Sequence, residues 1–134
     1  MKRKFKIMVA SALAAVCLAV PASAYFSIGS GVSYEVSTDY KKWNNKNTSS
    51  AWMLNSSSNC VFSATRTAGD GKATFTVYQW TTGNDYERGS WSSEYSLSKK
   101  GLTGNPVPGD DYYATVELTS GTSMKGKVTL AYES

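Results

Sequence analysis

Hydrophobic and polar residues alternate with a period of two along most of the chain beyond residue 24. In "GVSYEVST", Val32, Tyr34 and Val36 fall on one side, and Ser33, Glu35 and Ser37 fall on the other. Side chains of a β-strand point alternately to its two faces, so this pattern predicts strands with one buried and one wet face. We expect seven short strands, in residues 31–38, 49–55, 59–67, 72–80, 90–98, 111–120 and 125–133.

Turn residues separate these runs. Asp70 and Gly71 in "AGDGK" predict a tight hairpin between the strands on either side, and residues 120–126 predict a second one. Residues 38–49, 81–89 and 99–111 are polar or rich in Gly and Pro, and we expect loops there. Seven short strands bounded by turns predict a two-sheet antiparallel β-sandwich, with a small β-barrel as the alternative.

The first 24 residues have a different pattern. Four basic residues precede an apolar run over residues 7–20, and the segment closes with Ala22 and Ala24. This order is typical of a secretory signal peptide, and the apolar run is shorter than the roughly 20 residues of a membrane span. We therefore expect residues 25–134 to form a single domain that is secreted, extracellular or cell-wall associated, with no stable membrane insertion after cleavage.

Removing this segment changes the charge. The whole chain carries 14 basic and 10 acidic residues, but four of the basic ones lie in residues 1–24, so residues 25–134 carry no net charge. A nucleic-acid-binding protein needs a basic face to neutralise phosphates. The neutral composition argues against nucleic acid as a partner and against a cationic membrane-active peptide.

Cys60 is the single cysteine of residues 25–134, and the chain has no histidine. We expect Cys60 to be a buried small residue on a strand face with Phe62 and Ala64, in a protein that is mostly monomeric; a disulfide-linked dimer through Cys60 is the alternative. Without histidine, Ser-His-Asp and Cys-His nucleophiles and the usual zinc sites cannot be built. We expect no enzyme, no cofactor and no catalytic residue.

Carboxylates offer two weaker signals. Asp85, Glu87 and Glu94 lie near aromatic residues, as the acidic pair of a glycosidase would, but we interpret them as solvated charges, because nearness in sequence is not a geometry. Asp110 and Asp111 are the first candidates for a structural calcium site, although the chain has no D-x-D-x-D-G pattern. We therefore predict no metal site.

The aromatic residues give the best functional signal. If Phe75 and Val77 face the core, then Tyr78 and Trp80 lie on the opposite side or pack beneath a loop, and Tyr86 follows in the next polar segment. Exposed aromatic rings stack on sugars or anchor protein partners, whereas packed ones form cross-strand pairs. We name Tyr78, Trp80 and Tyr86 as candidate ligand-binding residues for a glycan or protein at the cell surface.

Three segments carry a resemblance: "SSAWMLNSSSN", "TVYQWTTGND" and "YYATVELTSGTSMKGKVTLAY". In composition and order of turns the chain resembles small exported all-β proteins of Gram-positive bacteria with no assigned activity. The resemblance implies an exported β-domain and transfers no functional residue. Because some such proteins are encoded near export or bacteriocin genes, it adds an alternative to a binding protein, namely a secreted antimicrobial or signalling protein.

Overall fold

The computed structural model describes residues 25–133, apart from 29–30, 47–50, 55–58 and 105–106. The predicted signal peptide lies outside the described residues. All regular structure in the described part is β, and no helix there could cross a membrane. The strands are β1 (Tyr25–Ser27), β2 (Val32–Ser37), β3 (Lys42–Asn44), β4 (Trp52–Met53), β5 (Cys60–Gly69), β6 (Lys72–Gln79), β7 (Tyr86–Ser93), β8 (Leu97–Gly101), β9 (Asp111–Ser120) and β10 (Ser123–Glu133).

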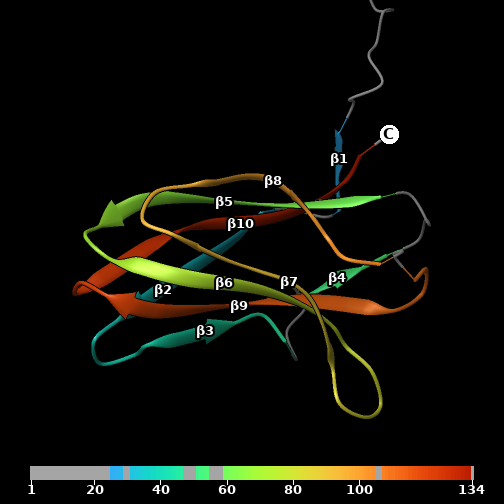
Figure 1. Ribbon diagram of the computed structural model, residues 1–134, viewed down its shortest axis with the longest axis horizontal. Helices are drawn as coiled ribbons and strands as arrows, with labels where there is room; N and C mark the ends of the chain where they lie inside the picture. Colours follow the sequence, from blue (N-terminus) through green and yellow to red (C-terminus); the bar gives the residue numbers. More distant parts are fainter. Residues whose placement is uncertain (1–24, 29–30, 47–50, 55–58, 105–106, 134) are drawn as a thin grey trace, which may run out of the picture.

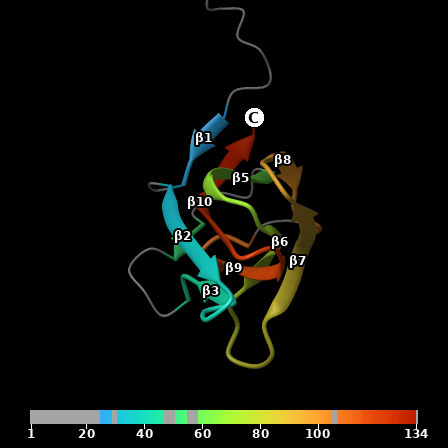
Figure 2. The same ribbon diagram turned by 90° about the vertical axis from the view of Figure 1, so that its left-hand side faces the viewer.

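The strands form two antiparallel sheets that pack face to face, which confirms the predicted sandwich and not the barrel (Figure 1). Sheet I has the order β1-β10-β5-β8, with β2 also paired to β10. Sheet II has the order β3-β9-β6-β7, with β4 also paired to β9. Viewed from the side, the edge strands β2 and β3 lie next to each other, and β7 and β8 close the opposite side (Figure 2).

Both predicted hairpins are wrong. The turn at Asp70 joins β5 of sheet I to β6 of sheet II, and the turn at Gly121 joins β9 of sheet II to β10 of sheet I. The two turns lie side by side: the Asp70 carboxylate accepts hydrogen bonds from the Thr122 N–H at 2.9 Å and its hydroxyl at 2.8 Å. The Gly71 N–H donates to the Ser123 carbonyl at 2.8 Å. Turn residues therefore mark the reversal correctly, but they do not encode whether the chain stays in one sheet.

The strand bounds also differ from the predicted ones. The segment predicted as one strand over 90–98 is divided between β7 and β8, because the Ser93 hydroxyl accepts a hydrogen bond from the Tyr95 N–H at 3.1 Å in a turn that leads from sheet II to sheet I. β7 begins inside the predicted loop 81–89, and β8 extends into the predicted loop 99–111. Part of the predicted loop 38–49 is β3, paired to β9.

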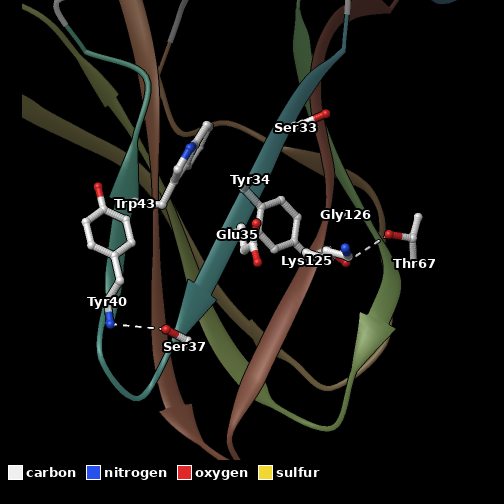
Figure 3. A pocket seen from close by; sticks show the side chains of 9 residues that line it. All are labelled: Ser33, Tyr34, Glu35, Ser37, Tyr40, Trp43, Thr67, Lys125 and Gly126. Atoms are coloured by element: carbon white, nitrogen blue, oxygen red, sulfur yellow. Dashed lines mark hydrogen bonds between the residues drawn. The ribbon is translucent and has the colours of Figure 1, made fainter.

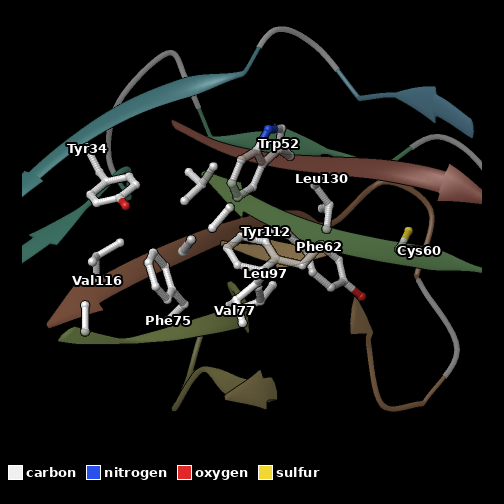
Figure 4. Close-up of a cluster of buried hydrophobic side chains, with 14 of the residues drawn as sticks. Tyr34, Trp52, Cys60, Phe62, Phe75, Val77, Leu97, Tyr112, Val116 and Leu130 are labelled. Atoms are coloured by element: carbon white, nitrogen blue, oxygen red, sulfur yellow. The ribbon is translucent and has the colours of Figure 1, made fainter. Parts of the chain in front are cut away.

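The core lies between the sheets and follows the predicted alternation (Figure 4). Phe75 and Val77 are buried, as predicted, on the inner face of β6. Phe62 stacks on Trp91, with ring centroids 5.6 Å apart, and Tyr34 meets Phe75 edge to face at 5.5 Å. Aromatic contacts of this kind link sheet I to sheet II and fix how the two sheets pack.

Cys60 is buried at the end of this core, in agreement with the prediction of a buried small residue. Burial raises the pKa of its thiol to about 11, because the thiolate is poorly solvated there. The thiolate is the reactive form, so this environment makes Cys60 a poor nucleophile at neutral pH. A disulfide between two chains would require this side chain to leave the core.

Candidate functional site

The outer face of sheet II, opposite Phe75 and Val77, presents polar side chains in rows across the strands. Directly paired residues of neighbouring antiparallel strands share a face, so the register defines each row. The first row is Lys42, Glu117, Thr74 and Ser92; the second is Asn44, Thr115, Thr76 and Ser90; the third is Tyr113, Tyr78 and Glu87. The contributing strands β3, β9, β6 and β7 are not consecutive along the chain, yet sheet II brings their outward side chains into one regular surface.

Hydroxyl groups make up much of the first two rows. Thr74 and Ser92 share a hydrogen bond of 3.0 Å between their hydroxyls, and Thr76 and Ser90 share another of 3.0 Å. A hydroxyl can donate one hydrogen bond and accept two. Each pair therefore retains hydrogen-bonding capacity that a ligand could use.

A shallow hollow of about 140 Å³ lies on this face. Its lining consists of Lys42, Thr74, Thr76, Tyr78, Thr115 and Glu117. The hollow thus combines hydroxyls, one ammonium and one carboxylate with the half-buried ring of Tyr78. We call this set the sheet II hollow.

The aromatic residues at the end of the rows form a cluster. Tyr78 stacks on Tyr113 with ring centroids 5.3 Å apart, and Trp80 meets Tyr113 edge to face at 6.3 Å. Trp80 follows β6 directly, and its N–H donates to the Asp111 carbonyl at 2.8 Å. The structure therefore places the predicted Tyr78 and Trp80 together, on the predicted face, and packs both against Tyr113.

Asp85 holds this cluster from the β6–β7 loop. One carboxylate oxygen accepts a hydrogen bond from the Tyr113 hydroxyl at 2.6 Å and forms an ion pair with Lys46 at 2.7 Å, while the other oxygen accepts from the Thr81 N–H at 2.9 Å. The bond from Lys46, then those from Tyr113 and Thr81, lower the pKa of Asp85 to about 2. Burial, followed by the bond to Asp85, raises the pKa of Tyr113. Asp85 is thus a positioned ion and not the solvated charge that the sequence suggested.

Lys46 also covers part of the aromatic surface. Its ammonium lies 5.2 Å from the ring centroid of Trp80 and 5.2 Å from that of Tyr113, within the range of cation–π attraction. A sugar stacking on Trp80 would compete with this ammonium. Tyr78 is therefore the better-placed ring for a ligand, because it lines the hollow itself.

Tyr86 is separated from the other two predicted residues. It pairs with Gln79, whereas Tyr78 pairs with Glu87, so the register puts Tyr86 on the opposite face of β7 from the row of Tyr78. Its side chain is 59% exposed, and the Arg88 guanidinium lies 5.7 Å from its ring centroid. The predicted trio is therefore one pair and one isolated tyrosine.

The calcium candidates take part in a different network. The Asp110 carboxylate accepts a hydrogen bond from the side-chain NH2 of Gln79 at 2.6 Å, and the side-chain oxygen of Gln79 accepts one from Arg88 Nε at 3.0 Å. In the described part of the chain, no group of three or more His, Cys, Asp or Glu side chains could hold a metal ion.

Sequence reasoning did not single out Tyr113 or Lys46, and it interpreted Asp85, the third residue that holds the cluster together, as a solvated charge. Alternation alone assigned Tyr113 to the face opposite Tyr112, but nothing local indicated that β9 pairs with β6. Lys46 and Asp85 lie in two loops 39 residues apart. No protein-family model, no curated protein and no solved structure matches the chain.

Proposed function

We propose that the protein is a secreted, non-catalytic glycan-binding protein that acts at the cell envelope or outside the cell, with the sheet II hollow as its binding site. The observation that carries the proposal is that the two hydroxyl-rich rows lie next to the half-buried ring of Tyr78, which belongs to the third row. Export is inferred from the sequence of residues 1–24 alone.

The chemistry of the lining favours a glycan over a protein partner. The cores of protein–protein interfaces are rich in apolar and aromatic side chains and poor in charges. The hollow instead has three threonines, Lys42 and Glu117 around one ring. Sugars match this composition, because their hydroxyls pair with such groups while their C–H faces stack on tyrosine.

The aromatic cluster has a supporting role in this proposal. Tyr113 packs against one side of the Tyr78 ring, and Asp85 orients Tyr113 through its hydroxyl. A contact ring that is already held in place loses less side-chain entropy when a ligand binds, so the affinity is higher. Trp80 packs edge to face against Tyr113, and Lys46 lies over the Trp80 ring, so both also help to hold Tyr113 in place.

The test is binding of the purified protein, without residues 1–24, to a glycan array and to isolated cell-wall polysaccharide. We expect Tyr78→Ala to weaken binding about tenfold, because one sugar–ring contact contributes on the order of 1.4 kcal/mol. Tyr86→Ala is the matched control: it removes a tyrosine from the other face and should bind as the wild type does. Wild type that binds no glycan, or Tyr78→Ala that binds equally well, would contradict the proposal.

The antimicrobial alternative has its own readout. A secreted antimicrobial protein should inhibit a related strain at micromolar concentration. Inhibition that persists in Tyr78→Ala, together with no glycan binding by wild type, would favour that alternative over the glycan-binding function.

A further inference from the structure

A second concave site lies on the side of the sandwich where the edge strands β2 and β3 meet (Figure 3). Its volume is about 530 Å³, within the roughly 300–1,000 Å³ of small-ligand sites, whereas the sheet II hollow, at about 140 Å³, is smaller than that range. Tyr40 and Trp43 lie on the β3 side of it, and Lys125 and Thr67 lie beyond β2 on the other side. We call it the β2–β3 groove.

Tyr40 is an exposed ring on a well-defined turn. Its side chain is 60% exposed. The Ser37 N–H donates to the Tyr40 carbonyl at 2.9 Å, and the Tyr40 N–H donates to the Ser37 carbonyl at 3.1 Å and hydroxyl at 3.2 Å. The backbone position of this ring is therefore fixed by the turn, which lowers the entropy cost of using the ring as a contact surface.

The other two rings anchor the groove to the core. Trp43 is half-buried and lies 6.2 Å from Tyr34 between ring centroids. Tyr34 is buried, and its hydroxyl donates to the Thr65 carbonyl at 2.9 Å. Neither ring can turn away without disturbing the core, so the inner wall of the groove is formed in advance.

Charged groups stand beside these rings. Glu35 and Lys125 are exposed cross-strand neighbours, yet no ion pair joins them in the part of the chain that the structure describes. Their carboxylate and ammonium can accept and donate hydrogen bonds to a ligand's hydroxyls. The Thr67 hydroxyl already donates to the Lys125 carbonyl at 3.3 Å, and it can still accept a hydrogen bond from a ligand. Rings next to unpaired polar heads suit a saccharide better than an apolar ligand, which would leave those heads desolvated.

The groove and the sheet II hollow lie on opposite faces of one short strand. Trp43 of β3 lines the groove, and its neighbour Lys42 lines the hollow. Side chains at successive positions of a strand point in opposite directions. Two ligands bound at these sites would therefore leave the protein in different directions.

We infer that the β2–β3 groove is a second saccharide site, with Tyr40 as its stacking ring, and that the protein bridges two glycan chains. This inference rests on the proposed glycan-binding function. It adds a ligand site and an activity, cross-linking, which a single hollow could not provide.

The experiment measures stoichiometry by isothermal titration with soluble hexasaccharides of β-1,4-linked N-acetylglucosamine, β-1,4-linked glucose and α-1,4-linked glucose. For at least one of these, wild type should bind two equivalents. Tyr40→Ala and Tyr78→Ala should each keep one equivalent at wild-type affinity and weaken the other about tenfold, below detection at the concentration used, and the double variant should weaken both. Tyr95→Ala is the control, because Tyr95 is 66% exposed in the β7–β8 turn and lines neither site. Beads coated with the same sugar should aggregate with wild type and Tyr95→Ala, and bind without aggregating with either single variant.

The outcomes separate the two proposals. One equivalent that is lost in Tyr78→Ala and kept in Tyr40→Ala overturns the second site and leaves the proposed function intact. One equivalent that is lost in Tyr40→Ala and kept in Tyr78→Ala overturns bridging and moves the function to the groove. No binding of any hexasaccharide, with none on the glycan array, overturns both. Thermal unfolding of each variant verifies that lost binding is not lost folding.

Discussion

Replacing Asp85 tests how the aromatic cluster is held. Its carboxylate accepts hydrogen bonds from Tyr113 and Thr81 and pairs with Lys46. Asp85→Ala leaves the Tyr113 hydroxyl and the Thr81 N–H without this acceptor. Asp85→Asn removes the charge and keeps one acceptor oxygen, which can serve Tyr113 or Thr81 but not both. It therefore removes the ion pair and one hydrogen bond, whereas Asp85→Ala removes all three interactions.

The expected losses follow from exposure. Lys46 is 31% exposed, so water compensates for much of the ion pair, which contributes up to about 1 kcal/mol. Tyr113 is 7% exposed, so its unpaired hydroxyl costs about 1–3 kcal/mol. We expect Asp85→Ala to lower the free energy of unfolding by about 2–3 kcal/mol, and Asp85→Asn by about 1 kcal/mol.

The loss should depend on pH. Folding lowers the pKa of Asp85 to about 2 from 3.8, so the stability it adds is complete above the unfolded value and disappears as the pH falls through the folded one. The shift corresponds to about 2.4 kcal/mol at most, and solvent screening leaves about 1–2 kcal/mol. The gap between wild type and Asp85→Ala should narrow from pH 5 to pH 2.

Urea unfolding followed by tryptophan fluorescence at pH 7, 5, 3 and 2 measures this gap directly. Titrations of the other carboxylates are common to both proteins and cancel in the difference. Glu94→Ala, in the exposed β7–β8 turn, controls for the loss of one carboxylate and should leave stability nearly unchanged. A gap that stays constant with pH, or an Asp85→Ala protein as stable as wild type at pH 7, would refute the role given to Asp85.

Two further predictions concern the core. Gly126→Ala should destabilise the fold by about 3 kcal/mol or more in urea unfolding, since a Cβ there would overlap the Thr65 carbonyl of the neighbouring strand. Gly101→Ala, where a Cβ meets open space, is the matched control, and equal stabilities would contradict the packing. Cys60, buried and with its pKa raised to about 11, should resist a thiol reagent at pH 7.5 until urea unfolds the protein. Labelling of native protein at the unfolded rate would show that the thiol is accessible.

Alternation predicted which side of each strand faces the core, because that property is local. Phe75 and Val77, Tyr34 and Val36, and Cys60 and Phe62 are all buried as expected. The class of fold follows from the same pattern, because strands with one apolar face bury it most readily between two sheets.

Pairing between strands could not be predicted in the same way. The chain reverses at Asp70 and at Gly121, where turn residues indicated it, but both reversals cross from one sheet to the other. A hairpin and a crossing turn use similar residues, and the choice depends on which distant strand offers a partner. β5 pairs with β10 and β8 instead of with β6, and nothing in the sequence of β5 itself indicates this choice.

The candidate sites could be predicted only in part, because they too depend on which strands pair. Tyr78 and Trp80 were found because alternation and aromatic character are visible along one strand. Tyr113, Lys46 and Asp85 come from β9 and from two loops, and only the pairing of β6 with β9 unites them. The β2–β3 groove was missed for the same reason: Tyr40 and Trp43 lie in a predicted loop, and Lys125 lies at the start of the last predicted strand.

If the protein binds glycans at the sheet II hollow as we propose, the division between faces has a consequence for how it can change its ligand. The core side chains of β6 and β9 point inward, and the residues of the sheet II hollow point outward from the same strands. A substitution at Thr74 or Thr115, which are both partly exposed, therefore alters a surface without opening a cavity in the core. Asp85 differs from both groups of residues. Its loss would disturb the position of Tyr78, the proposed ligand-contacting ring, through Tyr113, and it would also lower the stability of sheet II. In the proposed function, specificity can thus vary through the residues of the first two rows, while Tyr78 and Tyr113 of the third row have to be kept.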